Sequence, residues 1–250
     1  IFDWDDTLLC TTAINSRCWM EGQLQQLERA AEQLLRLAMQ LGDTIIVTNG
    51  KPMWVKESCQ HFLPGLLPLV EQLPVISARA RFEHLFPNDP FAWKRQTFRK
   101  ILQCRHRQAP ENLGLNLVVL GDSHAEIEAA RTATELVSGC RVLIKTVKLR
   151  SMPSCAQLVG QLRKVKGELE KIVGEGRSAS KLLVLRDLSP SSWRTPGEAS
   201  AWRMASNKTA GSPWSRALRA SSEAIPGKAS KESTERVGSS IAKKVSTLML

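Results

Sequence analysis

Three carboxylates lie within four positions near the start of the chain. Asp3, Asp5 and Asp6 directly follow the apolar pair Ile1-Phe2, which is typical of the end of a buried strand. Like charges this close together are unfavourable unless a cation or a reaction uses them. At a strand end, Asp3 and Asp5 can face one cleft, where one could attack phosphorus and the other could transfer a proton. An acidic turn that caps the next helix is the alternative interpretation, and this segment alone favours neither.

Further polar residues follow the next apolar segments along the chain. Thr48 ends a β-branched run, Lys94 opens a helical segment after a proline, and Asp122 follows another apolar run. Each alone is a common turn or surface residue. The carboxyl ends of parallel strands share one edge of the sheet, and ligands bind there. We therefore expect these three side chains to join the acidic pair at one rim.

The elements that must position these residues alternate between strands and helices. Apolar residues recur at intervals of three and four between residues 24 and 38 until Gly42 ends the pattern, which indicates a helix. Short apolar runs bounded by turn residues indicate strands. We expect strands at 44–47, 74–76, 115–120 and 140–144, and helices at 13–41, 52–62, 91–104, 125–134 and 156–173. This order predicts an α/β fold with a doubly wound, mainly parallel, Rossmann-like sheet.

The order of the polar motifs is similar to that of a known superfamily. The run Asp3-Trp4-Asp5-Asp6-Thr7 resembles the DxDxT signature of phosphatases of the haloacid dehalogenase (HAD) superfamily. Thr48, Lys94 and Asp122 match the residues of the second, third and fourth motifs of that family. Glu126 stands where the family usually has a second acidic residue, so GDxxxE replaces GDxxxD. The resemblance covers residues 1–150 and specifies no substrate.

This resemblance implies a magnesium-dependent phosphatase that forms an aspartyl-phosphate. Asp3 would be the nucleophile, and Asp5 would be the general acid and then the general base. Mg²⁺ would be held by Asp3, the main-chain carbonyl of Asp5, and Asp122, with Glu126 as the further acidic residue of the metal shell.

Phosphate binding is assigned by the same resemblance. Thr48 and the amides around Asn49 would bind the phosphoryl oxygens, and Lys94 would balance the charge of the nucleophile and of the phosphate. About 40 residues separate Asp5 from Thr48 and about 45 separate Thr48 from Lys94, which leaves little or no room for a cap domain. Members without a cap act on large substrates, so the resemblance implies a phosphorylated macromolecule such as a protein.

Two alternatives stay open at this stage. A small phosphate ester would be the substrate if the helix at 13–41 closed over the site. A catalytically silent HAD-like scaffold that binds a phosphorylated partner is the alternative function. The presence of Asp3, Asp5, Thr48 and Lys94 together with Asp122 argues against a silent scaffold, because binding alone does not need all five.

Composition and charge separate a core from a tail. The net charge is +11, and residues 176–250 hold 13 Lys or Arg against 5 Asp or Glu, which is +8. This segment is rich in Ser, Ala, Gly and Pro, so we expect a basic, mostly disordered tail. We expect a catalytic core at 1–150, whose first strand begins upstream, and a helical extension at 151–175. Nucleic acid could bind the tail, although a linker without a fixed partner is the preferred interpretation.

The cysteines and the apolar runs exclude several classes of protein. The six cysteines form no CxxC pair, so neither a zinc site nor a disulfide framework is expected. Reduced thiols favour a cytoplasmic location, with the nucleus as the alternative. No apolar run reaches the roughly 18 residues that a membrane span needs.

Overall fold

Parallel strands alternate with helices in the described part of the chain, which confirms the expected α/β class. The computed structural model describes residues 1–108, 114–133 and 142–182. The strands are β1 (Ile46–Thr48), β2 (Val75–Ser77), β3 (Leu115–Gly121), β4 (Val142–Lys148) and β5 (Ala179–Leu182). The helices are α1 (Thr11–Asn15), α2 (Glu21–Leu41), α3 (Trp54–Phe62), α4 (Leu67–Val70), α5 (Ala78–Phe82), α6 (Pro90–Gln108), α7 (His124–Ala133) and α8 (Cys155–Gly174), with a 3-10 helix, η1, at Pro64–Leu66.

The first residues of the chain join two groups of parallel strands. β1 pairs with β2, and β4 lies between β3 and β5. Phe2 forms parallel bridges to Ile46 in β1 and to Leu120 in β3. The amide of Asp3 donates to the carbonyl of Leu120 at 3.0 Å, and the carbonyl of Phe2 accepts from Val47 at 2.8 Å. Residues 1–3 therefore take the place of a strand between β1 and β3, as the apolar pair before the acidic cluster predicts.

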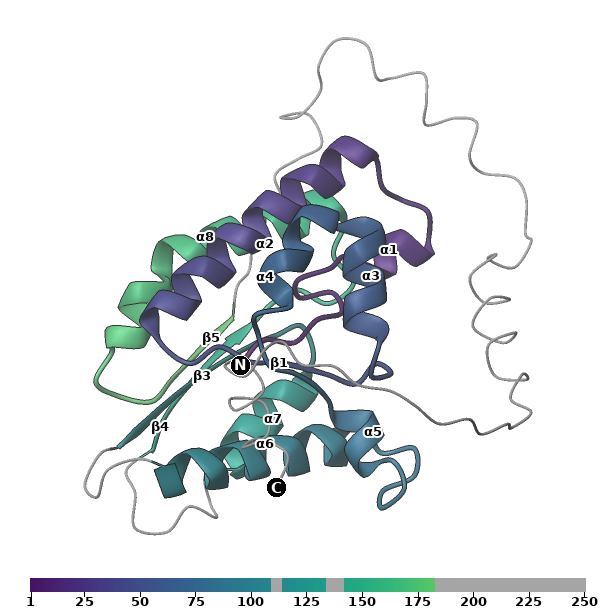
Figure 1. Cartoon of the computed structure of the whole chain (residues 1–250). Helices are drawn as coiled ribbons and strands as arrows, with labels where there is room; N and C mark the ends of the chain where they lie inside the picture. Colours follow the sequence, from purple (N-terminus) through teal and green to yellow (C-terminus); the bar gives the residue numbers. More distant parts are fainter. Residues whose placement is uncertain (109–113, 134–141, 183–250) are drawn as a thin grey trace, which may run out of the picture. The chain divides into compact units, whose positions relative to one another are not determined.

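Helices cover both faces of these strands. Figure 1 shows α2, α3, α4 and α8 on one side and α5, α6 and α7 on the other. Two apolar clusters fill the two interfaces. One contains Leu27 and Leu34 of α2 with Leu158 of α8, and the other contains Phe98 of α6 and Ala130 of α7. Burial of these side chains holds the strand ends, and the loops that follow them, in place.

The single helix expected at 13–41 is wrong, because the structure has two helices there. α1 ends at Asn15 and α2 begins at Glu21. Between them, Arg17 has a φ of 55°, which is a left-handed conformation that a continuous helix excludes. The apolar spacing was informative only from residue 24, and Gly42 ends α2 as predicted.

The expected end of the ordered core is also corrected. Residues 179–182 fall in the predicted disordered tail, but they form β5, which pairs in parallel with β4. The predicted helical extension forms α8, which packs against α2, and both belong to one compact unit at Ile1–Leu185. Apolar residues of both helices fill the core, so the helical extension packs on the core, and ordered structure continues past 175 to β5. The rest of the predicted tail, 183–250, lies outside the described residues.

Smaller differences concern the boundaries of elements. The strand expected at 140–144 is β4, which runs four residues further, to Lys148; residues 134–141 lie outside the described part of the chain. The helix expected at 91–104 is α6, which also continues for four more residues. Within the described ranges, no helix is long and apolar enough to cross a membrane.

Candidate active site

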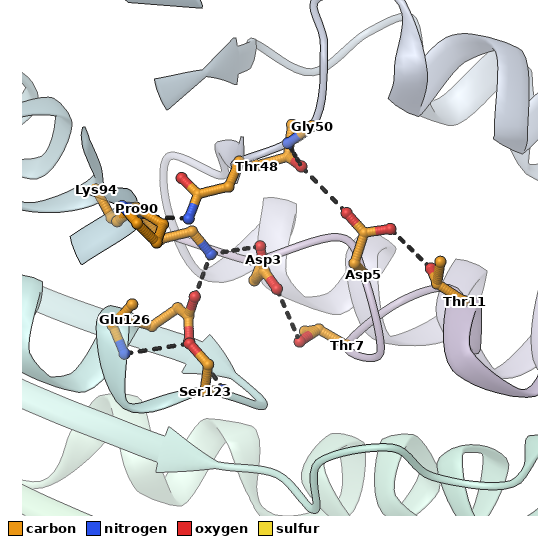
Figure 2. A network of polar contacts seen from close by, with 12 residues as sticks. Asp3, Asp5, Thr7, Thr11, Thr48, Gly50, Pro90, Lys94, Ser123 and Glu126 are labelled. Carbon is orange, nitrogen blue, oxygen red and sulfur yellow. Dashed lines mark hydrogen bonds and ion pairs between the residues drawn. The ribbon is translucent and has the colours of Figure 1, made fainter. Parts of the chain in front are cut away.

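The predicted site residues gather where residues 1–3, β1 and β3 end. Figure 2 shows Asp3 and Asp5 on the first loop, Thr48 at the end of β1, and Lys94 and Glu126 projecting from two helices toward Asp3. Asp3 is buried, with 5% of its surface exposed, and Lys94 and Glu126 are 2% exposed. The shared rim expected from the strand ends is therefore present.

Lys94 connects two carboxylates from different parts of the chain. Its Nζ donates to Asp3 Oδ1 at 2.6 Å and also to Glu126 Oε1. Burial alone would lower the pKa of Lys94, but the two carboxylates raise it above its usual value. Burial also opposes ionisation of Glu126, yet Lys94 and Ser123 hold the pKa of Glu126 below its usual value. Lys94 is therefore a fixed ammonium group in contact with the predicted nucleophile.

Asp3 has an unusually high pKa for a carboxyl group. Burial raises its pKa from 3.8 to about 7, against the opposing effect of Lys94, and Glu126 and Asp5 add to the increase. Asp3 Oδ1 accepts from Lys94, whereas the one donor to Asp3 Oδ2 among the described residues is the hydroxyl of Thr7, at a long 3.4 Å. Asp3 Oδ2 is thus the less engaged oxygen and the one available for attack.

Three donors from different elements orient Asp5. The hydroxyl of Thr11 and the indole N–H of Trp54 donate to Asp5 Oδ1 at 2.7 and 2.8 Å. The hydroxyl of Thr48 lies 3.4 Å from Asp5 Oδ2. Because two strong contacts converge on Oδ1, Oδ2 is left with the weaker one. A carboxylate held in this way can exchange a proton through Oδ2 without changing its orientation.

The neighbouring carboxylate, Asp6, has a structural role. Its Oδ1 accepts from the amide of Thr12 at 2.9 Å, and its other oxygen accepts from the hydroxyl of the same residue. These contacts satisfy donors in the first turn of α1. Asp6 has a φ of 52°, a left-handed conformation that turns the chain away from the strand. The helix-capping interpretation therefore applies to Asp6 but not to Asp3 or Asp5.

A tight turn follows Thr48 at the edge of the site. The amide of Gly50 donates to Thr48 Oγ1 at 2.8 Å, and Ser77 Oγ donates to the Gly50 carbonyl at 2.6 Å. A Cβ atom at Gly50 would lie 2.4 Å from Trp54 Cδ1, so only glycine allows this approach. Asn49 Nδ2 donates to the carbonyl of Pro90 at 3.2 Å, which ties the turn to the start of α6.

The loop after β3 is held through Asp122 and Glu126. Glu126 Oε2 accepts from the amide and the hydroxyl of Ser123. A Cβ atom at Gly121 would lie 2.4 Å from Glu126 Cγ, so glycine is required there too. The main-chain carbonyl of Asp122 accepts from Lys148 and Ser151. The Asp122 carboxylate has no hydrogen-bond partner among the described residues, and burial followed by the charge of Glu126 raises its pKa to about 6.

The oxygen donors of the site are compatible with a divalent cation. Across the described residues, no three His, Cys, Asp or Glu side chains converge on one point. Lys94 lies between Asp3 and Glu126, and its ammonium group supplies part of the positive charge that a metal ion would provide. Burial raises the pKa of Asp3 and of Asp122, so a bound cation would favour their ionised forms, and Mg²⁺ prefers such oxygen ligands.

Several residues of the site were not predicted from the sequence. Trp54 was not among the predicted site residues, but its indole N–H donates to Asp5. Thr11, Ser123 and Lys148 were not singled out at all. Ser123 follows a Gly-Asp pair and precedes Glu126 by three residues, a spacing typical of a helix cap, so its role could have been found. No local pattern marks Thr11, Trp54 or Lys148, because their partners are set by tertiary contacts.

Comparisons with known proteins do not add a relative to this description. Neither a family model, nor a curated protein, nor a solved structure matches the chain. What the site can do must therefore be argued from its own motifs and geometry.

Proposed function

We propose that this protein is a magnesium-dependent phosphohydrolase of the HAD type, which acts through an aspartyl-phosphate on Asp3. The observation that carries the proposal is the contact between Lys94 Nζ and Asp3 Oδ1 at 2.6 Å, across 91 positions of sequence. A buried lysine beside a buried carboxylate whose second oxygen has only a long contact suits a nucleophile that must approach an anionic phosphate.

The arrangement of the strands supports the HAD-like, doubly wound fold that the motifs imply. The order across the sheet is β2, β1, residues 1–3, β3, β4 and β5, with every pair parallel. Helices cover both faces (Figure 1). The first strands after residues 1–3, β1 and β2, lie on one side of them, and the later strands lie on the other side. In parallel α/β sheets, ligands bind at the point where the strand order reverses in this way. The acidic pair lies there.

The proposed reaction uses the two oxygens of Asp3 differently. Oδ1 stays with Lys94, and Oδ2 attacks phosphorus in line with the leaving oxygen to give the aspartyl-phosphate. Asp5 protonates the leaving oxygen through Oδ2 and then takes a proton from the water that hydrolyses the intermediate. Proton transfer of this kind contributes a factor of about 10² to 10⁴ in rate.

The remaining groups bind and balance charge. Thr48 Oγ1 and the amides around Asn49 would bind the phosphoryl oxygens, and Lys94 offsets the charge that gathers near Asp3 in the transition state. Mg²⁺, when bound, would supply charge neutralisation between Asp3 and the phosphate. Asp3, the Asp5 carbonyl and Asp122 would hold it. We assign Glu126 to holding Lys94, because both of its oxygens are already engaged.

The form of the segments between the motifs favours a phosphorylated macromolecule as substrate. α2, which was considered as a lid, packs against α8, and six of its side chains are buried. It is therefore unavailable to close over the site. The segment between Thr48 and Lys94 holds short elements, α3, η1, α4, β2 and α5, that pack on the sheet or on one another. A rim without a lid would admit a phosphorylated side chain of a protein more readily than it would retain a small ester.

The test is hydrolysis of an aryl phosphate by the full chain, with and without Mg²⁺. We expect magnesium-dependent turnover that Asp3→Asn abolishes and that Asp43→Asn leaves unchanged, because Asp43 is an exposed partner of Arg105. If a folded sample shows no turnover, trapping with beryllium fluoride, a mimic of aspartyl-phosphate, separates two cases. Binding that requires Asp3 keeps the chemistry and points to a strict substrate requirement. Absence of both turnover and trapping would leave only the silent scaffold.

A further inference from the structure

The loop that follows β4 holds the main chain at Asp122. The ladder between β3 and β4 ends with the pair Gly121 and Lys148, and the amide of Leu149 donates to the Gly121 carbonyl at 2.8 Å. Asp122 comes directly after this ladder, where strand pairing no longer fixes the peptide. Lys148 Nζ and Ser151 Oγ both donate to the Asp122 carbonyl instead. The direction of the Asp122 carboxylate, which accepts no hydrogen bond from the described residues, is therefore set by the peptide that these two donors hold.

Lys148 acts on this carbonyl rather than on a substrate phosphate. An ammonium group has three N–H donors. Lys148 Nζ donates to the Asp122 carbonyl, to the Leu149 carbonyl at 2.8 Å and to Ser151 Oγ at 3.2 Å. Ser151 Oγ accepts this bond and itself donates to the Asp122 carbonyl. All the donors of the ammonium group are therefore used within the protein, and no N–H is left for a phosphoryl oxygen.

The loop that carries Ser151 is itself anchored to the core. Leu149 is 0% exposed and belongs to the apolar cluster that α2 and α8 share. The amide of Arg150 donates to Gln161 Oε1 of α8 at 2.6 Å, and Gln161 is also 0% exposed. Because the loop is fixed at two neighbouring residues, the donors of Lys148 and Ser151 hold the Asp122 carbonyl in one position.

We propose that Lys148 is a positioning residue for Asp122 and that it strengthens the binding of Mg²⁺ at the candidate active site. The inference rests on the proposed function, in which Asp122 holds the metal ion. Loss of a residue that orients a metal ligand typically lowers metal affinity by about 10- to 100-fold. Ser151 assists, because it bridges the ammonium group and the same carbonyl. Neither residue touches the metal ion or the substrate in this role.

The charge of Lys148 and its hydrogen bonds have opposite effects on metal binding. A positive charge beside a cation site repels the cation, so its removal alone would strengthen Mg²⁺ binding. Loss of the hydrogen bonds frees the Asp122 peptide, so the carboxylate has to be ordered when Mg²⁺ binds, and binding weakens. Lys148→Met removes both the charge and the hydrogen bonds. The sign of the change in affinity therefore distinguishes positioning from charge alone.

The test measures binding of Mg²⁺ to the full chain without substrate, so it does not depend on turnover. Mg²⁺ is titrated by calorimetry at pH 8, above the raised pKa values of about 7 for Asp3 and about 6 for Asp122. Asp122→Asn shows which part of the signal comes from this ligand. Lys164→Met removes the same charge from an exposed position on α8 and is the matched control. Urea unfolding of each variant without Mg²⁺ measures stability separately.

We expect the dissociation constant for Mg²⁺ to rise by roughly tenfold in Lys148→Met and by about threefold in Ser151→Ala. Lys148→Arg, whose guanidinium group also donates several hydrogen bonds, should retain most of the affinity. Lys164→Met should stay within about twofold of the wild type. If Lys148→Met does not fold, Ser151→Ala decides alone, because Ser151 is exposed and its replacement changes no charge.

The proposal is overturned if Lys148→Met binds Mg²⁺ as tightly as the wild type or more tightly. A lower urea midpoint with unchanged affinity would mean that Lys148 only stabilises the fold. Two other outcomes would overturn the metal assignment of the proposed function, and this inference with it. They are a wild type that binds no Mg²⁺, and binding that Asp122→Asn leaves intact.

Discussion

Replacement of Lys94 by methionine tests the electrostatic core of the candidate site. Lys94 is the ammonium group between Asp3 and Glu126, and the three side chains are no more than 6% exposed. Methionine keeps most of the volume of the side chain but removes the charge. Two buried carboxylates then remain without their shared cation, and neither can reach bulk water.

The expected cost follows from the geometry. At 2.6 Å and an effective dielectric constant of about 20, the attraction between Lys94 and Asp3 is about 6 kcal/mol. The desolvation of the ammonium group offsets part of this, and removal of one partner of a buried pair typically costs about 3–5 kcal/mol. We therefore expect the free energy of unfolding of Lys94→Met to fall by about 3–5 kcal/mol at pH 8.

The cost should depend on pH in a definite direction. The pKa of Asp3 is already about 7 in the folded protein, above its usual 3.8, and loss of Lys94 raises it further. A folded-state pKa above the unfolded value means that the folded state holds the proton more tightly, so its stability falls as pH rises between these values. At pH 5.5 Asp3 is protonated in the variant, and the cost should be clearly smaller than at pH 8.

Urea unfolding of the full chain at both pH values, without Mg²⁺, measures these changes. Lys164→Met is the matched control, because Lys164 is exposed on α8, and we expect its effect to stay within about 0.5 kcal/mol. Adding Glu126→Gln to Lys94→Met should restore part of the lost stability. A cost below about 1 kcal/mol at pH 8, or an equal cost at both pH values, would refute the buried ion-pair argument.

Three further predictions concern other parts of the site. Trp54→Phe removes one of the two strong hydrogen bonds to Asp5, the predicted acid/base carboxylate. The kcat for an aryl phosphate should therefore fall by roughly tenfold, with little change in the urea midpoint, and an unchanged kcat would contradict this role. Gly50→Ala should destabilise the protein by about 1–3 kcal/mol in urea unfolding, because a Cβ atom would meet the indole of Trp54. Gly167→Ala is the control in α8, where a Cβ atom meets open space, and it should stabilise the protein by roughly 0.5–1 kcal/mol. Without metal, the raised pKa values of Asp3 and Asp122 should make thermal stability decrease from about pH 4 to pH 7. Added Mg²⁺ should raise the melting temperature more at pH 8 than at pH 5, and an equal shift at both pH values would argue against carboxylate ligands.

The parts of the fold that the sequence predicted well are those with a local pattern. The spacing of apolar residues along α2 and the stop at Gly42 depend only on neighbours in the chain. β5 was missed because only two of its four residues, ASKL, are apolar, and these two neither adjoin nor alternate with polar residues. Their place in the sheet comes from pairing with β4, a partner more than 30 positions away. Such pairing leaves no local signal.

Inside the site, too, residues marked by a local pattern could be predicted, whereas contacts between distant parts of the chain could not. Asp3, Thr48 and Lys94 could be named because each follows or begins an element whose end the sequence marks. The contacts of Asp6 and Glu126 could not be predicted from the sequence. Asp6 is one of three similar carboxylates, and only the left-handed turn at this residue directs it to α1. Glu126 was grouped with metal ligands, whereas its oxygens contact Lys94 and Ser123.

The difference between the predicted and the missed residues of the site has a physical cause. Side chains that do chemistry need a particular functional group, so their identity is visible in the sequence. Residues that hold them need only one donor at the right place, and many residue types from any element can supply it. Asp5 is held by a threonine of α1 and a tryptophan of α3, and the carbonyl of Asp122 by a lysine of β4. A scaffold kept only for binding would need neither the fixed orientation of Asp5 nor a lysine buried against Asp3. Both features impose desolvation or ordering costs, and proton and phosphoryl transfer are the reactions that would use them.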